Sequence, residues 1–95
     1  MTQAIADYFK TQPVVKAWLF GSFARGEETD QSDVDILVEY DKNARISLLL
    51  ISHMMVALEK VAGRPVDLVE NGCLLPFAVE TANRDKILIY ERNHS

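Results

Sequence analysis

The sequence is poor in cysteine and has no long apolar run, and each of these features excludes a class of protein. A single cysteine, Cys73, cannot form an internal disulfide, and no Cys or His stands near it at the spacing of a metal site. No run of about 18 apolar residues is present, so we expect no transmembrane helix. The first ten residues have no apolar segment after a basic start, which predicts a cytoplasmic protein.

Basic residues are scarce as well. The chain has 10 Lys and Arg against 14 Asp and Glu, which is a formal net charge of −4. Proteins that bind nucleic acids rely on clustered Lys and Arg that release counterions from the phosphate backbone. The charge balance therefore argues against a polynucleotide partner and favours proteins, or small anions accompanied by a metal ion.

Length and composition indicate one compact domain. Of the 95 residues, 48% are hydrophobic and 25% are charged, and no repeat, low-complexity tract or linker divides them. We therefore expect residues 1–95 to form a single domain. A chain this short hardly supports both a core and a deep substrate cleft, so a second chain is a plausible source of part of an active site.

Hydrophobic periodicity and turn residues predict an α/β (α+β) domain, in which a small mixed β-sheet is flanked by helices. Asp41 or Asn43 is expected to cap the long helix, Gly63 to end it in a left-handed conformation, and residues 92–95 to be frayed. The expected elements are a helix at 2–11, strands at 14–20 and 34–40, a helix at 45–62, a strand at 65–70, a turn at 71–72, a short helix at 76–83 and a strand at 86–91.

The 45–62 helix is apolar on nearly all sides, which is unusual for a surface helix. Two explanations are open. The second apolar side is either an interface for a homo- or hetero-oligomer, or it is covered by another segment of this small domain. The side expected to face the sheet consists of Ile46, Leu49, Leu50, Met54, Ala57 and Val61, and the other side consists of Leu48, Ile51, Met55 and Leu58.

The most informative stretch spans residues 14–39. An apolar strand ends at Gly21 and Ser22, a polar loop follows, and Asp33 and Asp35 then open a second apolar strand. Two carboxylates one residue apart on a strand point to the same face, where they raise each other's pKa unless a metal ion or a proton compensates. Magnesium is commonly held by one or two carboxylates together with substrate phosphates. The stretch therefore predicts a nucleotide phosphate placed over a magnesium ion.

Chain topology adds a third carboxylate. The Gly21–Ser22 turn can meet Asp33 and Asp35 only if the two strands are antiparallel and share that end of the sheet. The long helix that follows is a crossover, which usually makes the strands that it joins parallel. Asp67, early in the third strand, is then expected to lie beside Asp35.

These residues also carry a family resemblance. The run G-S-F-A-R-G-E-E-T-D-Q-S-D-V-D matches the pattern Gly-Ser, ten residues, Asp-x-Asp of the DNA polymerase β-like nucleotidyltransferase superfamily. The run P-V-D-L-V resembles the strand that carries the third carboxylate of that superfamily. The resemblance extends from about residue 13 to residue 91, and the short chain is similar to the minimal nucleotidyltransferases. It implies a fold like the polymerase β palm and magnesium-dependent nucleotidyl transfer.

The resemblance assigns a role to each residue of the motif. Gly21 and Ser22 would contact the phosphates of a nucleoside triphosphate, and Asp33 and Asp35 would ligate two magnesium ions. Asp67 would be the third acidic residue, either as a ligand of the second ion or as the base that accepts the proton of the attacking hydroxyl.

Arg25 has two open interpretations. It is a candidate phosphate contact, because it lies in a short helix whose first N–H groups, together with Ser22, can bind an anion. Alternatively it pairs with one of the acidic loop residues Glu27, Glu28 or Asp30, as surface arginines commonly do.

The resemblance also implies an acceptor. Minimal nucleotidyltransferases of this kind resemble the antitoxins of paired systems whose toxin is a HEPN-domain ribonuclease, and the implied activity is transfer of AMP from ATP to a tyrosine of that toxin. Two rival hypotheses remain. The protein is a subunit that modifies a small molecule such as an aminoglycoside-like polyol, or it is a non-catalytic antitoxin that masks its partner by binding.

Overall fold

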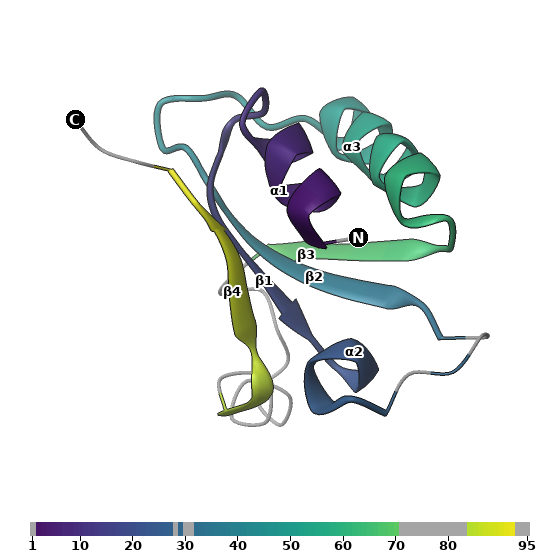
Figure 1. The fold of residues 1–95 in the computed structure, drawn as a ribbon. Helices are drawn as coiled ribbons and strands as arrows, with labels where there is room; N and C mark the ends of the chain where they lie inside the picture. The colour runs from purple at the N-terminus through teal and green to yellow at the C-terminus, as the bar shows by residue number, and fades with distance from the viewer. Residues whose placement is uncertain (1, 28, 30–31, 71–83, 93–95) are drawn as a thin grey trace.

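A four-stranded mixed β-sheet forms the centre of the chain (Figure 1). The computed structural model describes residues 2–27, 29, 32–70 and 84–92. The predictions for Cys73, for the turn at 71–72 and for the helix at 76–83 lie outside these residues. The elements are α1 (Thr2–Phe9), β1 (Val14–Phe20), α2 (Ser22–Arg25), β2 (Val34–Tyr40), α3 (Leu48–Ala62), β3 (Val66–Glu70) and β4 (Ile87–Glu91).

The sheet has the order β3-β2-β1-β4 and the predicted strand directions. β1 is antiparallel to β2 and to β4, whereas β2 and β3 are parallel and are joined through α3. Phe20 at the end of β1 is paired with Asp35, and Asp35 is paired in turn with Asp67 of β3. The predicted α/β class and the adjacency of the two aspartates are confirmed.

The helices α1 and α3 cover one face of the sheet, as Figure 1 shows. Val34, Ile36 and Val38 of β2 are fully buried in the core cluster on this face. Because side chains alternate along a strand, Asp35 points to the opposite face, and so does Leu37, which is also fully buried. The rest of the cluster consists of Ile5, Phe9, Val14, Ala17, Leu19, Met54, Leu58 and Val66.

The predicted cap of α3 was wrong. Ser47 is the N-cap, and its hydroxyl accepts the Leu50 N–H at 3.1 Å. Asp41 instead accepts the N–H of Asn43 at 2.9 Å, so the two expected cap residues form a turn before the helix begins. The C-terminal prediction is confirmed, because Gly63 has a φ of 73° and its N–H donates to the Glu59 carbonyl.

Leu50 and Met54 face the core as predicted, but the predicted orientation of α3 was wrong for Leu49, Val61, Ile51 and Leu58. Met54 and Leu58 are fully buried, and Leu50, Ile51 and Ala62 pack against the core. Leu49, which was expected to face the sheet, is 71% exposed, and Val61 is exposed as well. Periodicity cannot choose between two apolar stripes on a helix that is apolar nearly all round.

Part of the apolar surface of α3 is not covered within the described chain. Leu48 is 83% exposed and Val56 is 52% exposed, whereas Ile51 and Leu58, which were expected on the same side as Leu48, pack against the core or belong to it. Oligomerisation through the 45–62 helix remains a prediction. Among the described residues, no helix is long and apolar enough to cross a bilayer.

Arg92 corrects a further expectation, because this residue is tied down and not frayed. Its Nη1 lies 2.7 Å from Asp41 Oδ2, and its Nη2 donates to the Gln12 carbonyl at 3.1 Å. The side chain thus joins the segments that flank the start of β1 and the end of β2. Residues 93–95 lie outside the described chain.

Replacing Ser47 by Ala is expected to lower the free energy of unfolding by about 1 kcal/mol, because the Leu50 N–H loses its acceptor. Chemical denaturation measures the change. Ser52→Ala is the matched control, since Ser52 is exposed inside the same helix and Ala favours helix there. Equal stability of Ser47→Ala and the wild type would contradict the prediction.

Candidate active site

Gly21 brings the end of β1 against the start of β2. Its φ is 71° and its ψ is −148°, a conformation that favours glycine. A Cβ built on Gly21 would overlap the Asp35 carboxylate and would lie only 3.3 Å from the Asp35 Cγ. The Gly-Ser turn and the Asp-x-Asp segment therefore meet at one end of the sheet, as the predicted antiparallel pairing requires.

The short helix α2 continues directly from this turn. It is a single turn closed by the Arg25 N–H, which donates to the Gly21 carbonyl at 3.2 Å, and it ends at Gly26 in a left-handed conformation. The first N–H groups of a helix have no acceptor within the helix. Ser22 and these N–H groups follow the glycine that contacts Asp35, which is where the sequence predicts the phosphate contacts.

Three carboxylates are associated with this end of the sheet. Asp35 is half-buried, while Asp33 and Asp67 are exposed. Burial raises the pKa of Asp35 above its usual value, the charges of Asp67 and Asp33 raise it further, and Arg25 opposes them. An ionised Asp35 is therefore unfavourable here unless a cation compensates the charge.

The carboxylate oxygens are the groups of this site that could bind a metal ion. In the described part of the chain, no three His, Cys, Asp or Glu side chains gather closely enough to hold one metal ion. The register nevertheless places Asp35 beside Asp67, with Asp33 two residues before Asp35. An oxygen-only set of carboxylates fits magnesium, which completes its coordination with substrate phosphates and water. Ligation by Asp33, Asp35 and Asp67 remains a prediction.

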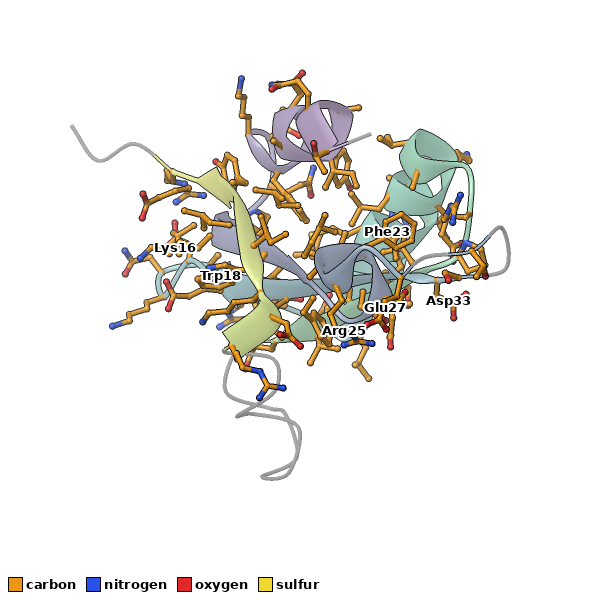
Figure 2. All side chains as sticks on the ribbon, turned by 60° about the horizontal axis from the view of Figure 1, so that its bottom comes forward. Lys16, Trp18, Phe23, Arg25, Glu27 and Asp33 are labelled. Carbon is orange, nitrogen blue, oxygen red and sulfur yellow. The ribbon has the colours of Figure 1, made fainter. Side chains whose placement is uncertain are left out.

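Arg25 has two acidic partners. Figure 2 shows it beside Glu27, and its Nε lies 3.3 Å from Glu27 Oε2. Its Nη1 lies 3.7 Å from Asp85 Oδ2, a buried oxygen with no hydrogen-bond partner in the described chain. Of the predicted loop partners, Glu27 is observed, whereas residues 28 and 30 lie outside the description. The phosphate contact of Arg25 remains a prediction.

Two further residues lie at this end of the molecule, and the sequence did not predict that they would. Asp85 faces Arg25 although 60 positions separate them along the chain. Arg64 donates to the loop that precedes Asp33. Neither residue carries a local signal, because an arginine after a helix and an aspartate before a strand are common on protein surfaces.

A mixed sheet whose glycine-serine turn lies against paired strand carboxylates is the architecture of a nucleotidyltransferase. Residues 3–91 match the family described as the nucleotidyltransferase domain, and the chain belongs to this family. The fold and the enzyme class that the sequence predicted are thereby confirmed.

Two relatives are named for protein modification. A candidate protein adenylyltransferase of Methanocaldococcus jannaschii is 35% identical over 86 residues, which cover 90% of this chain and 83% of that protein. The protein adenylyltransferase MntA of Thermococcus cleftensis is 37% identical over 71 residues, which cover 75% of this chain and 70% of that protein.

Solved structures share the fold. A candidate minimal nucleotidyltransferase is 32% identical, with a TM-score of 0.75 over 90% of this chain and 86% of that one. A toxin-antitoxin structure with AMP-PNP has a TM-score of 0.79 at 17% identity over 96% of this chain and 73% of that one. A complex of the tri-AMPylated HEPN toxin of Shewanella oneidensis with its MNT antitoxin has a TM-score of 0.64 at 15% identity, over 97% of this chain and 74% of that one. At the two lower identities the likeness shows the fold alone.

Proposed function

We propose that this protein is an antitoxin that transfers AMP from ATP to a tyrosine of a HEPN-type ribonuclease toxin. The observation that carries the proposal is the contact of the Gly21 backbone with Asp35, which is itself paired with Asp67 across β2 and β3. This arrangement puts a turn suited to phosphates next to paired carboxylates suited to magnesium.

A few residues share the binding and proton-transfer steps of the proposed reaction. Gly21, having no Cβ, lets the backbone approach the triphosphate, and Ser22 donates to it. Asp33, Asp35 and Asp67 would hold the magnesium ions, which when bound neutralise charge on the triphosphate and on the leaving pyrophosphate. The tyrosine oxygen forms a bond to the α-phosphorus while the bond from that phosphorus to pyrophosphate breaks. Asp67, exposed beside Asp35, would either accept the tyrosine proton or complete the metal site.

A protein acceptor is supported by relatives and by charge. The relatives in M. jannaschii and T. cleftensis are named for protein adenylylation, and the S. oneidensis complex holds an AMPylated HEPN toxin. The formal charge of −4 suits a protein better than a polynucleotide. The acceptor that we propose is therefore a HEPN-type toxin protein.

The test is a labelling experiment with the purified pair of proteins. With magnesium and ATP labelled at the α-phosphate, we expect label on a tyrosine of the toxin, together with loss of its ribonuclease activity. ATP labelled at the γ-phosphate should give no label, and a chelator should prevent transfer. A known nucleotidyltransferase run in parallel shows that the conditions support transfer.

Each other outcome indicates a rival function. Label on a small polyol, with none on the toxin, would indicate a small-molecule nucleotidyltransferase. A toxin that is neutralised without being labelled would indicate masking by binding. Either result would contradict the proposal.

A further inference from the structure

Arg64 contacts both α2 and the loop that follows it from a position just before β3. It lies between the end of α3 and the start of β3. Its Nη1 donates to the Thr29 carbonyl at 3.1 Å and to the Ser32 carbonyl at 3.3 Å. Its guanidinium carbon lies 4.9 Å from the centre of the Phe23 ring, which belongs to α2 (Figure 2).

The loop that Arg64 contacts is closed by its own hydrogen bonds. The Ser32 N–H donates to the Thr29 carbonyl at 3.0 Å, and the Thr29 N–H donates to the Ser32 hydroxyl at 2.8 Å. The Thr29 carbonyl therefore accepts both from Ser32 and from Arg64. One guanidinium nitrogen, Nη1, thus donates to two loop carbonyls while the charged group lies over the Phe23 ring.

The backbone on both sides of Asp33 is held by the Arg64–Pro65 segment. The Ser32 carbonyl, before Asp33, accepts from the Arg64 side chain. The Val34 N–H, after Asp33, donates to the Pro65 carbonyl at 2.9 Å. Asp33 itself is exposed and precedes β2, so these neighbours determine where its carboxylate points.

We propose that Arg64 is a positioning residue for Asp33. It fixes the backbone that would present the Asp33 carboxylate to a magnesium ion, and through Phe23 it ties that backbone to α2, the helix that begins at Ser22. Its effect on catalysis rests on the nucleotidyl transfer proposed above. Its hold on the loop is a property of the chain alone and can be measured separately.

The test compares Arg64→Met with Arg92→Met. Arg92 is a matched control, because it also donates to a backbone carbonyl, that of Gln12, and pairs with Asp41 at the opposite end of β1 and β2. Both variants lose a charged group and keep an apolar stem, and thermal denaturation is followed for both. Only Arg64→Met should alter the active site.

Two readouts follow the loop and the metal site. In Arg64→Met, hydrogen exchange of the Ser32 amide should be about tenfold faster. The reason is that Arg64 no longer holds the Thr29 carbonyl, which accepts the hydrogen bond of this amide. The affinity for magnesium with a non-hydrolysable ATP analogue, and kcat/KM for ATP, should each fall about tenfold to a hundredfold, as for groups that orient metal ligands. Arg92→Met should leave all three unchanged.

Either of two results would overturn the proposal. One is a wild-type rate of hydrogen exchange at the Ser32 amide in Arg64→Met, and the other is an equal loss of magnesium affinity in Arg64→Met and Arg92→Met. If Arg64→Met does not fold, Arg64→Gln decides, since it removes the charge over Phe23 and shortens the side chain that donates to the two carbonyls. Arg64→Gln with wild-type exchange and wild-type magnesium dependence overturns the proposal, and a loss in either measurement supports it. If the wild type transfers no AMP, the proposed function fails, while the exchange of Ser32 still decides the role of Arg64.

Discussion

Replacing Asp35 by Asn is expected to lower the rate of nucleotidyl transfer about a thousandfold, because a bound metal ion contributes several kcal/mol of transition-state stabilisation that a neutral amide cannot support. Asn has nearly the shape of Asp, so the contact with Gly21 and the pairing with Asp67 should persist. The rate is measured with α-labelled ATP and saturating toxin, and complex formation is measured by calorimetry. Transfer should be lost while binding of the toxin is retained.

The same variant should gain stability when a chelator is present. Burial and the charges of Asp67 and Asp33 raise the pKa of Asp35, so its contribution to stability is full below the usual pKa of an aspartate and is lost as pH rises through the raised value. Asn has no charge to desolvate. The melting temperature of Asp35→Asn should therefore exceed that of the wild type at neutral pH, and the difference should shrink in acid.

Asp7→Asn is the control for both measurements. Hydrogen bonds from Lys10 and Gln3 lower the pKa of Asp7, which lies exposed on α1, so its effect on the pH dependence of stability has the opposite sign. Transfer should be normal in this variant. If Asp35→Asn transfers AMP at the wild-type rate, metal-dependent catalysis at this site is contradicted. If it loses transfer but still neutralises the toxin fully, neutralisation occurs by masking.

Replacing Gly21 by Ala is expected to lower transfer about a hundredfold, since a displacement of about 1 Å in a reacting site has effects of this size. The new Cβ would overlap the Asp35 carboxylate and push it from its place beside Asp67. The positive φ of Gly21 with a ψ of −148° is a conformation almost restricted to glycine, so Ala adds a cost of about 1–3 kcal/mol to the fold. Transfer and the free energy of unfolding are measured on the same preparation.

Gly63→Ala is a control for replacing a glycine of positive φ where no overlap arises. Gly63 has a φ of 73° and a ψ of 20°, whereas Gly21 combines a φ of 71° with a ψ of −148°, and nothing lies within 4 Å of a Cβ built on Gly63. This variant should lose about 1 kcal/mol of stability and keep full transfer. If Gly21→Ala and Gly63→Ala both transfer AMP at the wild-type rate, then Gly21 does not determine the position of Asp35.

Much of the sheet could be predicted because its signals are local. β1 and β2 have the predicted bounds, since both are mainly β-branched and apolar runs, interrupted only by Lys16, Asp35 and Glu39. The antiparallel direction of β1 and β2 followed from the need to bring the Gly21 turn to the Asp33–Asp35 segment. The parallel direction of β2 and β3 followed from the crossover rule for α3. The cap and the orientation of α3 could not be predicted in the same way. Several polar residues precede this helix, and more than one of its sides is apolar.

The long-range side-chain contacts could not be predicted from the sequence. Arg64 lies 35 and 32 positions from the loop residues that accept its hydrogen bonds. Asp85 reaches Arg25 from the segment before β4. Such contacts depend on where elements lie after packing, and many arginines and aspartates in the chain satisfy the same local criteria.

The sequence by itself determined the chemical groups and their order: a glycine-serine turn, two strand carboxylates after ten residues, and a third on a later strand. The spacing of these groups along the chain was enough to indicate a nucleotidyltransferase. Only the tertiary structure decided that Gly21 lies against Asp35, that Asp35 is level with Asp67, and that Arg64 holds the loop before Asp33. The physical reason is that the register of a sheet is set by its ladder of hydrogen bonds and by the packing of its buried face, which join residues far apart in the chain.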